Sequence, residues 1–197
     1  MKKTFFILYL MALLFKSVLA QNPEKPYSLV AHIGGGGGFF PGLIADMTTG
    51  HRIASLGIVG KYDYAEKWSL LAGLDYQFWY FKGYSYHDGN THPYTASGHI
   101  VRIPIRLEYN KRWFYMDFGP YLEKEFGDVS SGSIKEIATI GPTLEMGGRI
   151  RLSEKGKLRI GLQTSVGATL GIGYNHNVFF ERVEANSLIQ IGYEYCF

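Results

Sequence analysis

The chain has 197 residues, of which 46% are hydrophobic and 19% are charged, and it contains a single cysteine. The length suits one domain, and one cysteine excludes a disulfide-stabilised scaffold and any zinc or iron–sulfur site built from cysteines. Three of the 20 basic residues, Lys2, Lys3 and Lys16, lie in the first twenty positions, which contain no acidic residue, so 17 basic and 17 acidic residues remain beyond them. A neutral remainder lacks the sustained basic surface of a nucleic-acid-binding protein, so we expect no nucleic acid partner.

Residues 1–20 have the features of a cleaved signal peptide. A positively charged start is followed by the apolar run 4–15, and small residues at 18–20 stand where a signal peptidase reads. The run ends at Lys16 and is shorter than the about 20 apolar residues that span a membrane, which argues against the alternative of a retained anchor. We therefore predict an exported mature domain over 21–197.

Beyond the leader, apolar and polar residues alternate with a period of two, which is typical of β-strands with one apolar face. The clearest stretch is 101–110, where every odd position is apolar or aromatic and the even positions carry Arg, Pro, Arg, Glu and Asn. The pattern predicts eight strands, at about 28–39, 52–65, 68–82, 98–110, 112–126, 134–152, 157–173 and 183–197.

The connections between these strands alternate in length. Those near 66–67, 111 and 153–156 are tight, whereas the longer, polar ones lie at 40–51, 83–97, 127–133 and 174–182. Short turns at one end and long loops at the other are typical of a barrel that crosses an outer membrane. The sequence therefore predicts an all-β fold, an eight-stranded antiparallel up-and-down transmembrane β-barrel. A secreted lipocalin-like barrel is the alternative, but it explains neither the loop asymmetry nor the aromatic residues near the strand ends.

Three prolines, Pro104, Pro120 and Pro142, fall inside predicted strands, although a proline removes a hydrogen bond from the strand ladder. We expect each of them to mark a β-bulge. Residues beyond such a bulge would exchange their inward and outward sides.

The last six residues, 192–197, contain a glycine followed by spaced aromatic residues. This segment resembles the C-terminal signal of bacterial outer-membrane barrels, carried here by Gly192, Tyr195 and Phe197, although Ile191 stands where a polar residue is usual. The resemblance implies recognition by the barrel-assembly machinery and a location in the bacterial outer membrane.

The stretches 103–109 and 118–122 are similar to the small outer-membrane β-barrel domain that is abundant in Bacteroidota and includes PorT-like proteins of a secretion system. The resemblance covers nearly all of the mature chain, but its motifs are structural. It implies an outer-membrane barrel without catalytic residues, and it suggests a surface or secretion-complex protein as a partner.

The period-two pattern also assigns residues to the inside of the barrel. An eight-stranded barrel has room there for side chains but not for an aqueous channel, and buried charges must be paired. We expect the inward side chains to form a plug of ion pairs and hydrogen bonds, with a proton or solute path as the alternative. The charged members of the inward set are Asp75, Arg102, Arg106, Glu108, Asp117, Glu145, Arg149, Arg159 and Glu194, and the neutral ones are Gln77, Gln163 and Gln190.

No motif in the sequence predicts catalysis, a metal site or a cofactor. The glycines of 34–38 are not followed by the Gly-Lys-Ser/Thr of a phosphate-binding loop, and no carboxylate or cysteine spacing supports a metal cage around His87 and His92. Ser97 and His99 come nearest to a nucleophile and base, but no third member is evident. We expect a non-enzymatic protein without a cofactor. An enzyme that modifies lipid A in the outer leaflet is the alternative, followed by a small-solute channel.

The long loops carry aromatic residues that suit recognition. The candidate contacts are Tyr84, Tyr86, Tyr94, Phe179 and Phe180. Tyrosine-rich loops on a rigid barrel are typical of partner-binding surfaces. The alternative is that these residues only contact the sugar layer of lipopolysaccharide. The sequence thus predicts a structural or interaction protein in contact with lipopolysaccharide and other outer-membrane lipids.

Overall fold

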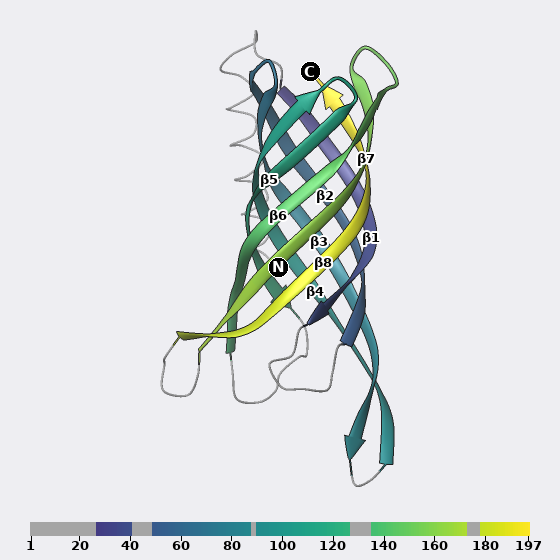
Figure 1. Ribbon diagram of the computed structural model, residues 1–197, viewed down its shortest axis with the longest axis vertical. Coiled ribbons are helices and arrows are strands. Elements are labelled where there is room, and N and C mark those ends of the chain that lie inside the picture. The colour runs from purple at the N-terminus through teal and green to yellow at the C-terminus, as the bar shows by residue number, and fades with distance from the viewer. Residues whose placement is uncertain (1–26, 41–48, 88–89, 127–134, 173–177) are drawn as a thin grey trace, which may run out of the picture.

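The computed structural model describes residues 27–40, 49–87, 90–126, 135–172 and 178–197, and it shows eight β-strands that close into one barrel (Figure 1). The strands follow one another in chain order, all neighbouring pairs are antiparallel, and β1 closes the barrel against β8. The predicted all-β, eight-stranded antiparallel up-and-down barrel is confirmed. The strands are β1 (Tyr27–Phe40), β2 (Thr49–Ala65), β3 (Trp68–His87), β4 (Asn90–Lys111), β5 (Phe114–Phe126), β6 (Lys135–Arg151), β7 (Gly156–Ile172) and β8 (Val178–Cys196).

Short connections lie at one end of the barrel, which we call the short-turn end. Glu66 and Lys67 join β2 to β3, Arg112 and Trp113 join β4 to β5, and residues 152–155 join β6 to β7. Arg112 has a φ of 53°, the left-handed conformation that such a tight turn uses. The start of β1 and the end of β8 lie at the same end, at the top of Figure 1. We call the opposite end the loop end.

Among the described residues, no helix is long and apolar enough to cross a membrane.

The predicted loop at 83–97 is instead a continuation of β3 and β4, so that prediction is wrong. The two strands stay paired to their tips, where His87 lies opposite Asn90. The pairing of β2 with β3 ends at Tyr80 and that of β5 with β4 ends at His99, so the β3–β4 hairpin extends beyond the rest of the barrel (Figure 1). A sequence signal for it was present, because an Asp-Gly pair between two strands is a frequent hairpin connection.

The three strand prolines do not produce bulges, and that prediction is also wrong. The register of β3 with β4 is the same on both sides of Pro104, and Pro120 lies directly opposite Pro142 in an unbroken β5–β6 register. Each proline leaves a gap in the pairing with only one of its two neighbouring strands. Pro104 still pairs with Tyr121 of β5, and Pro120 still pairs with Pro142 of β6. Inward and outward residues therefore keep their sides past the prolines. The register shifts lie elsewhere, at Asp63/Ala65, Glu136/Ala138 and Thr169/Leu170.

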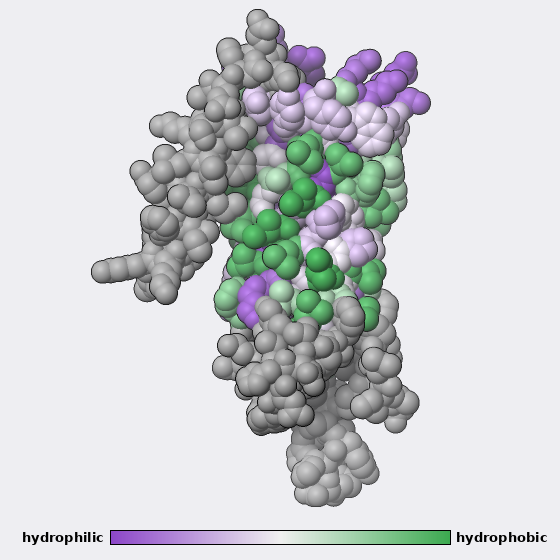
Figure 2. Space-filling model, turned by 90° about the vertical axis from the view of Figure 1, so that its left-hand side faces the viewer, coloured by the Kyte–Doolittle hydropathy of each residue, from purple (hydrophilic) through white to green (hydrophobic). Residues whose placement is uncertain are grey.

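The distribution of side chains is inverted relative to a water-soluble barrel. Most inward positions are polar or charged, and Arg102, Glu108 and Glu194 are completely buried. Large apolar side chains cover the outside instead, with Ile33 65% and Leu162 49% exposed. Figure 2 shows this apolar band on one side of the barrel, bounded at the short-turn end by hydrophilic residues. A large apolar surface of this kind is typical of a protein that contacts a membrane or another protein.

Candidate functional site

Two buried carboxylates, those of Glu108 on β4 and Glu194 on β8, organise the interior near the short-turn end. Lys61 Nζ lies 2.9 Å from Glu108 Oε1 and 3.2 Å from Glu194 Oε1. Arg159 Nη2 lies 2.6 Å from Glu108 Oε2, and its Nη1 lies 3.3 Å from Glu194 Oε2. Lys157 Nζ makes a further contact of 3.0 Å with Glu194. Shared charges thus link β2, β4, β7 and β8 across the interior.

A second group of charges surrounds Arg106. Its Nη1 lies 3.0 Å from Asp117 Oδ1 and 2.7 Å from Glu145 Oε2. The Tyr115 hydroxyl donates a hydrogen bond of 2.6 Å to Glu145 Oε1. Arg159 connects this group to the first one, because its Nη2 lies 3.6 Å from Asp117 Oδ2 and its Cζ lies 3.9 Å from the centroid of the Tyr115 ring. The two groups therefore form one network.

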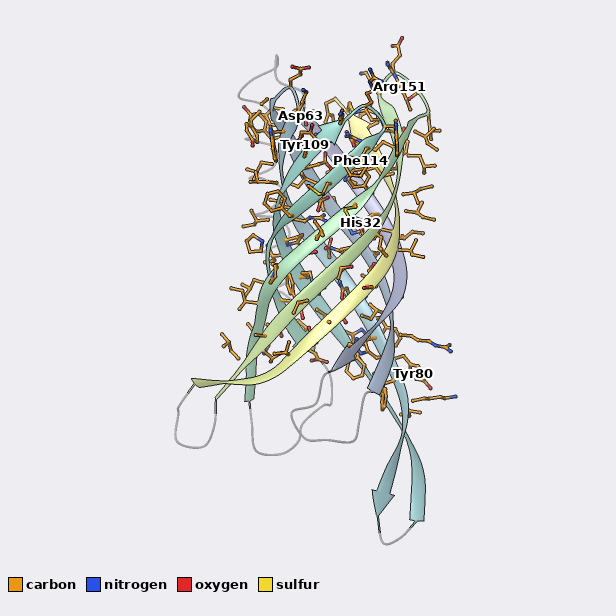
Figure 3. The ribbon with its side chains drawn as sticks, in the orientation of Figure 1. His32, Asp63, Tyr80, Tyr109, Phe114 and Arg151 are labelled. Atoms are coloured by element: carbon orange, nitrogen blue, oxygen red, sulfur yellow. The ribbon has the colours of Figure 1, made fainter. Side chains whose placement is uncertain are left out.

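Two further pairs lie nearer the middle of the barrel. Arg102 Nη2 is 2.7 Å from Glu123 Oε2, and Arg102 Nε donates to the same oxygen at 2.8 Å. Its Cζ also lies 4.0 Å from the centroid of the Tyr121 ring. His32 Nε2 lies 3.1 Å from Asp75 Oδ1, and Figure 3 places His32 at mid-height of the barrel. Hydrogen bonds between charged groups are about twice as strong as neutral ones, so these contacts hold the strands in a fixed arrangement.

Neutral side chains continue the interior network toward the loop end. Gln190 Nε2 donates to Gln163 Oε1 at 2.6 Å, and Gln163 Nε2 donates to Thr143 Oγ1 at 3.2 Å. Closer to the loop end the interior also contains a buried apolar cluster of Ile53, Trp79, Phe81, Ile100 and Leu188. Polar groups continue beside this cluster, since His51 Nε2 lies 3.1 Å from Asn186 Oδ1 and Glu184 is buried.

Two spaces adjoin the charged part of the interior. One is bordered by His32, Arg106 and Glu145 and has a volume of about 10 Å³, which is room for about one water molecule. The other is an open space of about 640 Å³ at the short-turn end. We call it the cup; Asp63 and Arg151, two of its lining residues, lie at that end of the barrel in Figure 3. The first space is too small to conduct a solute.

All nine charged residues predicted to face inward do so, and each has an ion-pair partner at 3.7 Å or less, counting His32 as the partner of Asp75. Sequence reasoning missed Lys61, Tyr115 and Glu123. Tyr115 and Glu123 stand two and six residues from Asp117 on β5, so both share its inward parity. The period-two rule finds Tyr115 directly, and it finds Glu123 once the register across Pro120 is known.

The residues of the predicted C-terminal signal lie at the end of the chain beside β1. Gly192 faces inward opposite His32, and a Cβ atom there would lie 3.2 Å from His32 Cβ. Tyr195 and Phe197 are exposed and pack edge to face, with ring centroids 5.3 Å apart. Their role in assembly stays a prediction.

The aromatic residues predicted as loop contacts belong to strands, so their assignment to loops is wrong. Tyr84 and Tyr86 lie in β3, Tyr94 lies in β4, and Phe179 and Phe180 lie in β8. Their side chains fall outside the described residues. Their role in binding stays a prediction.

The described residues contain no group of three or more His, Cys, Asp or Glu side chains that could hold a metal ion. Ser97 and His99 lie on the outer face of β4, and His99 Nδ1 is 2.5 Å from the hydroxyl of Tyr76. This histidine therefore meets a phenol on the outer surface, whereas a serine hydrolase site joins a histidine to both a serine and a carboxylate.

No protein-family model matches the sequence, and no curated protein matches it. Two solved structures are similar in fold. The outer membrane protein OprG from Pseudomonas aeruginosa is 15% identical, with 88% of this chain and 96% of that chain covered and a TM-score of 0.54. Neisserial surface protein A is 13% identical, with 87% and 97% covered and a TM-score of 0.53. The likeness shows that this chain has the fold of an outer-membrane β-barrel, whereas the resemblance to PorT-like proteins stays a prediction.

Proposed function

We propose that the protein is a non-enzymatic barrel of a bacterial outer membrane, with an interior closed by side chains and a loop end displayed outside the cell. The observation that carries this proposal is the inverted barrel, which is charged inside and apolar outside. A closed barrel also pairs its backbone groups between strands, as a lipid environment requires. Even β5, with 13 residues, is longer than the about 9–11 residues that a spanning strand needs.

The orientation follows from the two ends of the barrel. In outer-membrane barrels the short turns face the periplasm and the longer loops face outward. The loop end and the β3–β4 hairpin, which extends past its neighbours, therefore face the outside. Export through the predicted signal peptide at 1–20 fits this orientation.

The interior network has a structural role in this proposal. Arg102, Arg106 and Arg159 each hold carboxylates of other strands, so the side chains that fill the interior also fix the spacing of the strands around it. The space of about 10 Å³ among them holds about one water molecule, which supports a closed interior. The barrel thus acts as a rigid membrane-embedded support for its loop end.

We propose a different partner for each of three parts of the barrel: the outer face, the loop end and the C-terminal strand. Lipopolysaccharide and other outer-membrane lipids contact the apolar outer face. A protein of a surface or secretion complex contacts the loop end, which the resemblance to PorT-like proteins supports. The barrel-assembly machinery engages the C-terminal strand, which the pattern at Gly192, Tyr195 and Phe197 supports.

Cysteine labelling of intact cells tests the location and the orientation together. In a Cys196→Ser background, Lys82→Cys places a thiol on an exposed position of β3 near the loop end, and Lys155→Cys places one in the exposed β6–β7 turn. We expect a membrane-impermeant maleimide to label the Lys82→Cys variant in intact cells. The Lys155→Cys variant is labelled only after the outer membrane has been permeabilised.

Cys196→Ser alone is the control for background labelling, since Cys196 is the single cysteine of the chain. Labelling of both positions in intact cells would place the barrel elsewhere than across an outer membrane. Labelling of Lys155→Cys alone would reverse the orientation.

Planar-bilayer recording tests the closed interior. We expect the purified barrel to stay electrically silent after reconstitution, because the buried ion pairs and the apolar cluster fill its cross-section. Folding of the barrel is checked in the same preparation by the change in gel migration on boiling that folded barrels show, and its insertion is checked by co-flotation with lipid vesicles. Large, stable conductance steps would contradict the plug and favour a solute channel.

A further inference from the structure

The cup at the short-turn end adjoins the interior charges. It measures about 640 Å³ and is bordered by the turn between β2 and β3, the turn between β4 and β5, and the facing ends of β6 and β7. Pockets of about 300–1,000 Å³ are typical of small-molecule ligands, and a space of this size also admits a few side chains of a peptide. In the orientation proposed above, the cup opens toward the periplasm.

The lining of the cup is predominantly basic. It contains Lys61, Arg112, Arg149, Arg151 and Lys157 and two acidic residues on the β2–β3 side. The Glu194 carboxylate lies beneath the cup and forms ion pairs with Lys61, Arg149, Lys157 and Arg159. Within the described part of the chain, neither Arg112 nor Arg151 has a carboxylate within 4.0 Å. The mouth of the cup therefore carries positive charge that its own acidic residues do not neutralise.

Arg149 has long polar contacts for a buried cation. Its side chain is only 7% exposed, but its Nη1 lies 3.7 Å from Glu108 Oε1 and 3.6 Å from Glu194 Oε2. Its Nη2 donates to the Phe114 carbonyl oxygen at 3.5 Å, and its buried Nε has no hydrogen-bond partner in the described part of the barrel. A buried guanidinium with long contacts is costly unless an acceptor completes it. Arg149 thus offers donors to a ligand in the cup.

An unpaired acceptor lies in the same wall. Asn110 donates through Nδ2 to Ser69 Oγ at 2.8 Å, but its buried Oδ1 receives no hydrogen bond from the described residues. A ligand that satisfies both groups carries an anionic acceptor for Arg149 and an N–H donor for Asn110. A peptide with acidic side chains has both.

We propose that the cup binds an acidic peptide segment, whose carboxylates pair with Arg149 and with the basic residues at the mouth, and whose backbone N–H reaches Asn110. The acidic residues on the opposite wall, Asp63 and Glu66, favour this ligand over a compact phosphate. Concentrated negative charge is repelled by two carboxylates, whereas a peptide spaces its charges and offers amide donors to them.

Calorimetric titration of the folded barrel in detergent with hexaglutamate tests the proposal. We expect saturable binding that weakens as salt is added. The double variant Arg112→Asn/Arg151→Gln binds about ten-fold more weakly, because it removes two cations from the mouth and asparagine tolerates the left-handed conformation at residue 112. Arg149→Gln weakens binding to a similar degree.

Lys155→Gln is the matched control, because Lys155 is an exposed cation of the same β6–β7 turn that does not line the cup. We expect it to bind hexaglutamate as the wild type does, and we expect hexalysine not to bind. An equal loss in Lys155→Gln, or no saturable binding by the wild type, overturns the site. Displacement of hexaglutamate by pyrophosphate at equal concentration overturns the choice of a peptide. If Arg149→Gln does not fold, the double variant at the mouth decides the outcome, and none of these results depends on where the loop end lies in the cell.

Discussion

Replacing Arg159 by methionine lowers the free energy of unfolding by about 3–5 kcal/mol. Arg159 is 3% exposed and pairs with Glu108 at 2.6 Å, Glu194 at 3.3 Å and Asp117 at 3.6 Å. Methionine fills a comparable volume but leaves these buried carboxylates with fewer cations. The cost therefore arises from the unpaired charges and not from a cavity. Urea unfolding of the barrel in lipid vesicles, followed by tryptophan fluorescence, measures the change.

Two further variants test whether the cost of Arg159→Met comes from the unpaired carboxylates and not from the loss of any arginine. Arg151→Met removes an exposed arginine from the end of β6 and is expected to cost less than about 1 kcal/mol. Adding Glu108→Leu to Arg159→Met removes one of the unpaired charges, so the double variant costs less than the sum of the single ones. Additive costs in the double variant would mean that the two side chains do not interact.

Placing an arginine at Leu162 lowers the free energy of unfolding in lipid vesicles by about 2–4 kcal/mol. Leu162 is 49% exposed on the outer face of β7, where it lies between Met146 of β6 and Ile189 of β8. These neighbours are exposed apolar side chains too. The charge is therefore transferred into the hydrocarbon layer if the outer face contacts lipid.

The matched position is Leu152, an exposed leucine in the β6–β7 connection at the short-turn end. Leu152→Arg is expected to cost about 0–1 kcal/mol, because the penalty falls toward the membrane surface. Leu162→Ala controls for the loss of the leucine itself. A similar, small cost at both arginine positions would mean that water and not lipid surrounds the middle of the barrel.

Most of the architecture could be predicted because a barrel strand alternates its environment at every residue. Parity alone predicts that Glu108 and Arg159 face inward, and Arg159 Nη2 lies 2.6 Å from Glu108 Oε2. That distance joins strands that are not neighbours in the barrel, and no local pattern specifies it. Period two indicates which residues face inward, but it does not indicate which of them meet.

The predictions of bulges at the prolines and of a loop at 83–97 are wrong because each of these sequence features is compatible with two backbone structures. A proline in a strand either adds a bulge or leaves a gap in the ladder, and at Pro120 the opposite Pro142 keeps the register unchanged. Polar, glycine-containing sequence around 83–97 suits a loop as well as a hairpin that extends past its neighbours. The unpaired Nε of Arg149 depends on the spacing of several strands, so no sequence pattern could have found it.

The position of Glu194 on the last strand has a consequence for the order in which the barrel is completed. Lys61, Arg149, Lys157 and Arg159 all reach this one carboxylate, and they come from β2, β6 and β7. While β8 is not yet paired with both of its neighbours, Glu108 is the carboxylate that still contacts Lys61, Arg149 and Arg159. Pairing of β8 with β1 and β7 brings the second counter-charge and closes the barrel in a single step, so incomplete barrels are disfavoured by their own electrostatics.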